Sequence, residues 1–144
     1  MADQQNFANH TRWFPLVHFV TIPLLLLNFL YQAFRLYQEP GIDRAVWVVL
    51  CLVFMLIVLG ARLQALKAQD RTIRLEERLR YKELLTPELA KRASELPTGR
   101  IISLRFASDA ELAGLVERAL NGEFATTKDI KLAIKDWRGD YLRV

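Results

Sequence analysis

Nucleophilic and metal-binding side chains are scarce in this sequence of 144 residues, which holds two histidines and one cysteine. His10, His18 and Cys51 all precede residue 52, so the rest of the chain offers catalysis neither imidazole nor thiol. The spacings of common zinc, dinucleotide, phosphate-loop and serine-hydrolase motifs do not occur either. We therefore expect no enzymatic activity, no catalytic residue, no metal site and no cofactor.

Four polar side chains lie in an otherwise apolar stretch near the start of the chain. On a straight helix with 100° per residue they share an arc of about 80°. They are His18, Thr21, Asn28 and Gln32. A polar group without a hydrogen bond in hydrocarbon costs several kcal/mol, so this face is expected to contact protein rather than lipid. The only polar side chains in the second apolar stretch are Trp47 and Cys51, which are poor hydrogen-bond partners for this face. We therefore expect an intramembrane contact with another copy or another membrane subunit.

Two other interpretations of this polar face stay open. Thr21 can bond to its own helix backbone, and His18 and Gln32 lie near the ends of the stretch, within reach of water. Only Asn28 would then lack a partner. Alternatively, a dimer could hold haem between two copies of His18, because haem iron can be ligated by two facing imidazoles.

Two charge-free stretches are long enough to cross a bilayer. No charged residue occurs between Arg12 and Arg35, or between Arg44 and Arg62. A helix needs about 20 apolar residues for this, and arginines at the ends of the shorter stretch can extend toward the headgroups. The expected segments are a transmembrane helix at 13–37, an external turn at 38–43 and a transmembrane helix at 44–63.

The distribution of basic residues predicts the orientation in the membrane. Residues 62–82 contain seven Lys or Arg against three Asp or Glu, while residues 83–144 contain ten of each kind. Because basic residues near a membrane-spanning helix favour the cytoplasmic side, we expect both termini in the cytoplasm, with residues 1–12 as a cytoplasmic segment.

The remaining sequence predicts a basic helical stalk at 64–86 and a small cytoplasmic helical domain at 87–144. Thr86 followed by Pro87 predicts a helix start. The stretch 100–106 places Ile102, Leu104 and Phe106 on alternate positions, which predicts one short strand. No partner strand is evident.

Two further helices are predicted in this domain. Ser108 and Glu111 have the spacing of a capping box, which predicts a helix that Asn121-Gly122 ends. Thr126 or Thr127 caps the last helix, which extends to Arg138. Its basic side, within about 80°, is expected to consist of Lys128, Lys131, Lys135 and Arg138.

This basic surface could bind an acidic protein or anionic lipid, or could simply be solvated. Two capped helices with basic residues on the second also suggest a helix-turn-helix. The connection between them is too long for that motif, and the net charge of this region is zero, so no nucleic acid is expected.

The two ends of the chain, "QNFANHTRW" and "IKDWRGDYLRV", combine polar and aromatic residues. They resemble the ends of a small bacterial family of two-span membrane proteins of unknown function. The resemblance implies a multi-pass protein of the bacterial inner membrane, and it transfers no catalytic or binding residue. If both ends lie in the cytoplasm, they could pack together at the membrane surface.

Together these patterns predict an all-α membrane protein. The expected fold is a two-helix transmembrane hairpin, whose second span continues into the stalk and the small C-terminal domain. The expected function is non-enzymatic: a homo-oligomer, or an accessory or assembly subunit of a larger bacterial membrane complex. The alternatives are a membrane-anchored adaptor for an acidic protein or anionic lipid, and a haem-holding redox subunit.

Overall fold

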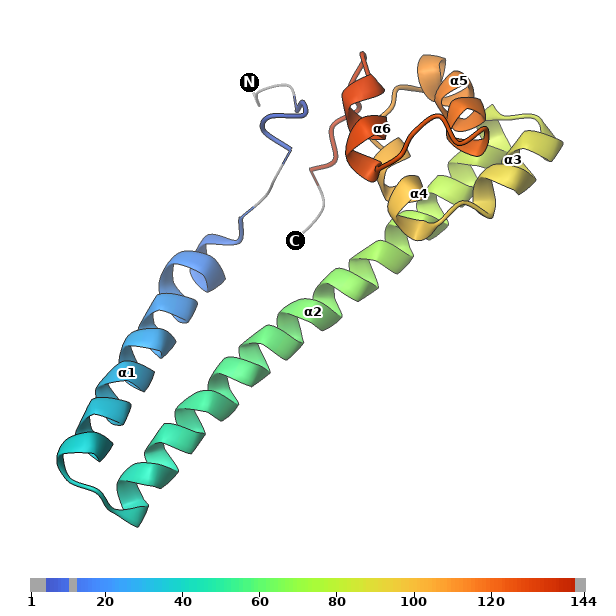
Figure 1. Ribbon diagram of the computed structural model, residues 1–144. Helices are drawn as coiled ribbons and strands as arrows, with labels where there is room; N and C mark the ends of the chain where they lie inside the picture. Colours follow the sequence, from blue (N-terminus) through green and yellow to red (C-terminus); the bar gives the residue numbers. More distant parts are fainter. Residues whose placement is uncertain (1–4, 11–12, 142–144) are drawn as a thin grey trace. The chain divides into compact units, whose positions relative to one another are not determined.

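The computed structural model describes residues 5–10 and 13–141, and within these residues the fold is all-helical, without strands. A single antiparallel bridge joins Ala107 to Trp137. The elements are a π-helix η1 (Leu16–Thr21) and the α-helices α1 (Ile22–Gln38), α2 (Ile42–Leu84), α3 (Pro87–Ser94), α4 (Thr98–Leu104), α5 (Asp109–Leu120) and α6 (Thr127–Ala133) (Figure 1).

The described residues form two compact units. Residues 13–66 form the first, which we name the apolar unit. Residues 5–10 and 67–141 form the second, which we name the terminal unit because it contains segments from both ends of the chain.

The apolar unit consists of two helices that run in opposite directions and meet at the short link 39–41 (Figure 1). Both α1 with η1 and the long α2 are long and apolar enough to cross a membrane. Their large side chains are largely exposed, for example Leu27 at 63% and Leu56 at 65%. The expected pair of long apolar helices is therefore present.

The π-helix η1 precedes Pro23 and has a local cause. Proline carries no amide hydrogen, so it cannot donate to the carbonyl four residues before it. The turn before it is widened, and the Thr21 hydroxyl donates to the carbonyl of Leu16, 3.0 Å away. Such π-turns satisfy the backbone where an ordinary helical bond is missing.

The terminal unit begins inside α2, where the sequence predicts a stalk. Ile73, Glu77, Tyr81 and Leu85 recur every four residues and are all buried. One face of this helix therefore packs into the unit, and Tyr81 and Leu85 belong to its core. The face mixes charged with apolar residues, so no apolar periodicity reveals it in the sequence.

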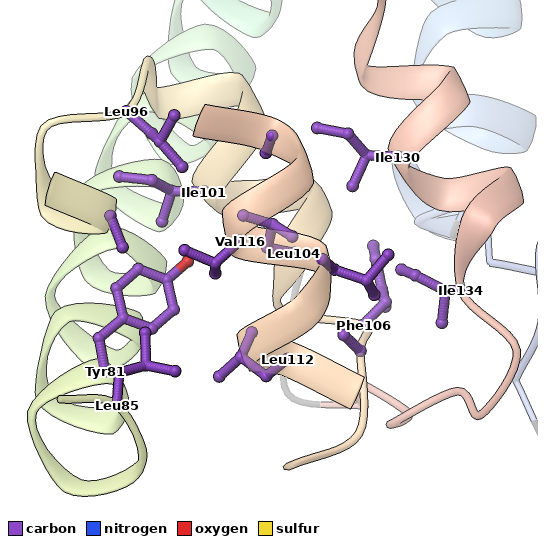
Figure 2. Close-up of a cluster of buried hydrophobic side chains, with 14 of the residues drawn as sticks. Tyr81, Leu85, Leu96, Ile101, Leu104, Phe106, Leu112, Val116, Ile130 and Ile134 are labelled. Carbon is purple, nitrogen blue, oxygen red and sulfur yellow. The ribbon is translucent and has the colours of Figure 1, made fainter. Parts of the chain in front are cut away.

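The core of the terminal unit lies between the end of α2 and the four short helices (Figure 2). Its fully buried side chains come from almost every element of the unit. They include Tyr81, Ile101, Leu104, Phe106, Leu112, Val116 and Ile130.

The predicted strand at 100–106 is wrong, because this stretch contains α4 instead. Backbone amides of Arg100 and Ile101 donate to the carbonyl of Pro97, which starts the helix. Ile101 and Leu104, three residues apart, are fully buried, whereas Ile102 is only half-buried. A short apolar run fits both the two-residue period of a strand and the 3.6-residue period of a helix. Here the helix is favoured, because the described residues contain no strand to pair with it.

The termini of α3 and α5 largely follow the sequence signals. The Thr86 hydroxyl accepts a hydrogen bond from the amide of Leu89, as expected of a helix cap. Gly122, with φ +77°, ends α5 in the left-handed conformation that glycine adopts without strain. The predicted capping box at Ser108 is wrong, because this side chain makes no capping bond. Glu111 instead accepts from the amides of Lys135 and Asp136.

The last helix is shorter than expected. Thr126 caps α6 and forms a capping box with Asp129, but α6 ends at Ala133. The chain then becomes extended, and the amide of Arg138 donates to the carbonyl of Phe106 at 2.7 Å. This extended segment places Trp137 against the Phe106 ring, at 5.0 Å between centroids.

Candidate functional site

The polar face predicted in the first apolar helix is largely satisfied by its own backbone at its beginning. Nδ1 of His18 lies 2.9 Å from the carbonyl of Phe14, and the Thr21 hydroxyl bonds to Leu16. The His18 ring also lies edge-on to Trp13, at 5.0 Å between centroids. The Nδ1 atom of His18 and the hydroxyl of Thr21 are therefore satisfied by nearby backbone groups.

Asn28 is the exception on this face. Its amide nitrogen donates to the Sγ of Cys51 in α2, 3.0 Å away, and Cys51 is buried. A thiol sulfur is a weak acceptor, and the amide of asparagine has a second donor and a carbonyl oxygen. Neither has a partner among the described residues, although Asn28 is exposed.

Gln32 lies in a different environment from Asn28. It lines a hollow of about 440 Å³ close to the link between the helices, together with Arg35, Asp43 and Arg44. Because charged side chains border this hollow, the amide of Gln32 lies next to polar groups. Of the four predicted residues, Asn28 is the exposed one, whereas the other three are half-buried, and its second amide hydrogen and its carbonyl oxygen have no partner among the described residues.

An apolar cavity of about 450 Å³ separates α1 from α2 at the other end of the apolar unit. His18 and Arg62 are its polar lining residues, and the others are aliphatic or Met. The two helices therefore do not fill each other's surface completely, which leaves apolar area for a neighbouring molecule.

The four basic residues predicted as one surface do not share a helical face. Lys128 and Lys131 belong to α6, but Lys135 and Arg138 follow its end at Ala133. Nζ of Lys131 lies 3.1 Å from Nε2 of His10, and Arg138 lies 3.7 Å from the carboxylate of Glu77. The predicted shared helical face is therefore wrong, because α6 ends at Ala133 and extended chain follows it, whereas the predicted binding role of these residues stays a prediction.

A junction between the two ends of the chain is the most specific arrangement in the terminal unit. The His10 ring lies within 6 Å, between centroids, of Phe7, Phe106 and Trp137. The amide of Asp140 donates to the side chain of Gln5, which is buried. The expected contact between the polar-aromatic ends is confirmed.

A network of ionic side chains lies beside this junction, and Glu77, Arg80 and Arg105 in it are buried. The guanidinium of Arg80 donates to Glu77, to Asp109 and to the carbonyl of Ala107. Arg105 pairs with Asp140 at 2.9 Å. Burial raises the pKa of Glu77 and outweighs the opposing effect of the nearby arginines. Burial also raises the pKa of Tyr81, with a further contribution from the charge of Glu77.

Sequence reasoning missed this network because its members are far apart in the chain. Arg80 and Asp109 belong to different helices, and nothing in their local sequence pairs them. Among the described residues, no group of three or more histidine, cysteine or acidic side chains is placed to hold a metal ion.

Comparison with known proteins gives one match. The model of a family of unknown function (DUF6526) matches residues 1–144, which confirms the expected resemblance to an uncharacterised family. No curated protein and no solved structure matches the chain.

Proposed function

We propose, from the premise that the chain belongs to this family of unknown function, that it is a non-enzymatic integral membrane protein that self-associates through α1. The side chain of Asn28 is the observation that carries the proposal. It is exposed on a helix whose apolar window has no buried residue, and a thiol is its only acceptor in the part of the chain that the structure describes.

The exposed apolar surface supports a membrane location. Burying one large aliphatic or aromatic side chain contributes about 1.5–3 kcal/mol, and α1 and the first half of α2 leave many of them exposed. A water-soluble monomer rarely exposes such a continuous apolar surface. Hydrocarbon accepts this apolar surface without cost, whereas the exposed amide of Asn28 keeps a donor and an acceptor without partners among the described residues.

A second copy fits the chemistry of this amide. An asparagine side chain carries both donors and an acceptor, so two copies related by a two-fold axis can satisfy each other. Interhelical hydrogen bonds in membranes average about 0.6 kcal/mol, so the apolar packing around Asn28 has to contribute as well. Exposed leucines beside Asn28, such as Leu24 and Leu27, provide apolar surface for this packing.

The contact between the chain ends supports a topology with both termini on one side. Gln5 and His10 pack against residues that follow both apolar helices. A chain that crosses the membrane twice brings its ends to the same side, and the basic residues after the second span favour the cytoplasmic side.

The experiment compares the association of three variants in lipid vesicles by energy transfer between labelled copies. Asn28→Leu is expected to reduce dimerisation by about three-fold or more, because about 0.6 kcal/mol corresponds to this ratio. Thr21→Val, whose hydroxyl bonds within its own helix, is expected to associate like the native chain.

Cys51→Ala separates the two roles of Asn28. It removes the internal acceptor but leaves the amide available to another copy, so association is expected to persist or to strengthen. If Cys51→Ala weakens association as much as Asn28→Leu does, the amide serves only the internal packing and the proposal is wrong. Native association in the Asn28→Leu variant would equally contradict it.

A further inference from the structure

A groove on the terminal unit lies between α2 and α3, away from the junction of the chain ends. It has a volume of about 790 Å³ and is lined by both helices. The two helices are joined by the short turn after Leu84 (Figure 1). Its lining residues are Leu75, Arg78, Leu79, Lys82, Pro87, Ala90, Lys91, Ser94 and Glu95.

Part of the lining of this groove is apolar and exposed. Leu75 and Leu79 lie one helical turn apart on α2, and they are 61% and 53% exposed. The opposite side of the same helix is buried at Ile73 and Tyr81, of which Tyr81 belongs to the core. Two adjacent exposed leucines on a helix that already buries another face are typical of a surface that a partner covers.

The rim of the groove is basic. Lys82 and Lys91 form no ion pair with any described residue, and Glu95 is the single acidic lining residue. Arg78 donates to the carbonyl of Ser94 at 2.9 Å, which holds α3 against α2, while its buried Nε has no partner. The groove therefore combines apolar contact with uncompensated positive charge.

We propose that this groove binds an acidic amphipathic helix of a partner protein. A groove between two helices accepts the apolar face of a third helix, and leucines one turn apart match the spacing of its anchors. Acidic residues beside these anchors would pair with Lys82 and Lys91. This interaction is separate from the self-association proposed above.

The charge and shape of the groove disfavour two other occupants. A second copy of the same groove would bring like charges together, which costs free energy. A flat bilayer surface does not enter a concave groove. Both remain distinguishable outcomes of the experiment.

The test measures binding of a labelled peptide to the full chain in neutral-lipid nanodiscs by fluorescence anisotropy. The probe is a helix of roughly 18 residues with leucines at every third or fourth position and glutamates between them. A matched peptide with lysines in place of glutamates is expected to bind at least ten-fold more weakly. Equal binding of the two peptides would overturn the proposal.

Variants of the groove then locate the site. Leu79→Ser and the double variant Lys82→Glu, Lys91→Glu are each expected to weaken binding of the acidic peptide ten-fold or more. Leu132→Ser and Lys128→Glu are matched controls, because both residues are exposed on α6 of the same unit. Helical content measured by circular dichroism verifies that each variant is folded.

The remaining outcomes contradict the proposal. If Lys128→Glu weakened binding of the acidic peptide as much as the double variant does, the peptide would be attracted to positive charge in general and not to this groove. Binding of anionic vesicles that depends on Lys82 and Lys91, without binding of the peptide, would assign the groove to lipid. A concentration-dependent dimer of the terminal unit that Leu79→Ser abolishes would assign it to a second copy.

Discussion

At the scale of single residues, buried charge gives the terminal unit a specific pH dependence. Glu77 is buried, and its raised pKa means that the folded chain binds its proton more tightly than the unfolded chain. The free energy of unfolding contributed by this group is therefore greatest below its ordinary pKa of 4.5. It is lost as pH rises from there through the raised pKa of the folded state.

Glu77→Gln is expected to remove this dependence, because the neutral amide resembles the protonated carboxyl. The free energy of unfolding of the native chain minus that of the variant should therefore decrease as pH rises above 4.5, because only the native chain loses this contribution. Urea unfolding, followed by tryptophan fluorescence at several pH values, measures it. Glu76→Gln, at an exposed neighbouring position, serves as control, and a constant difference for Glu77→Gln would contradict the assignment.

A second ionisable residue, Asp129, gives the opposite pH dependence of stability. The hydroxyl and amide of Thr126 donate to Asp129, which lowers the pKa of that carboxyl below 3.8. The stability that this cap contributes is present above that pH and is lost as pH falls through the lowered pKa. Thr126→Ala is expected to cost about 1 kcal/mol at neutral pH, as measured by thermal unfolding. Thr127→Ala, which leaves the cap intact, should cost clearly less.

At the scale of elements, most signals that depend on neighbouring residues were predictable, and the capping box at Ser108 was the exception. The cap at Thr86, the glycine end of α5 and the capping residue Thr126 each act within four residues, so the sequence contains the whole cause. The strand predicted at 100–106 failed because the choice between helix and strand is made there by packing against other helices.

The helical form of α4 has a direct test. Ile101 is fully buried, whereas Ile102 is half-buried, although the strand hypothesis would place Ile102 in the core. Ile101→Ala is expected to destabilise the chain by about 2–5 kcal/mol, and Ile102→Ala by clearly less. Chemical denaturation measures both, and the reverse order would contradict the helix.

Among the candidate site residues, the sequence identified Asn28 through its isolation in an apolar stretch. It could not identify Cys51 as the acceptor of its hydrogen bond, because that contact depends on how α1 and α2 are rotated against each other. The network around Arg80 and the groove beside α3 were equally hidden, since both need residues from separate helices.

At the scale of the whole molecule, the proposed topology predicts where labels can react. With Cys51 replaced by serine, single cysteines at Asn6, Gly41 and Asn121 are exposed sites for a membrane-impermeant maleimide. In intact bacterial cells only Gly41→Cys should react, because the link between the spans is expected outside. Disrupted cells should label all three positions, and external labelling of Asn6→Cys or Asn121→Cys would contradict the topology.

The junction of the chain ends also has a consequence for biosynthesis. Gln5 and His10 are synthesised before the two apolar helices, but their contacts with Asp140, Lys131 and Trp137 can form only after those helices and the segment 131–140 have been made. In the proposed topology, a chain whose first helix inserted backwards would leave Gln5 and His10 on the wrong side. In that case the terminal unit can be completed only after the first helix has inserted correctly, so the stability of the newly made protein depends on correct insertion. Quality-control proteases would then remove the chains whose terminal unit is incomplete.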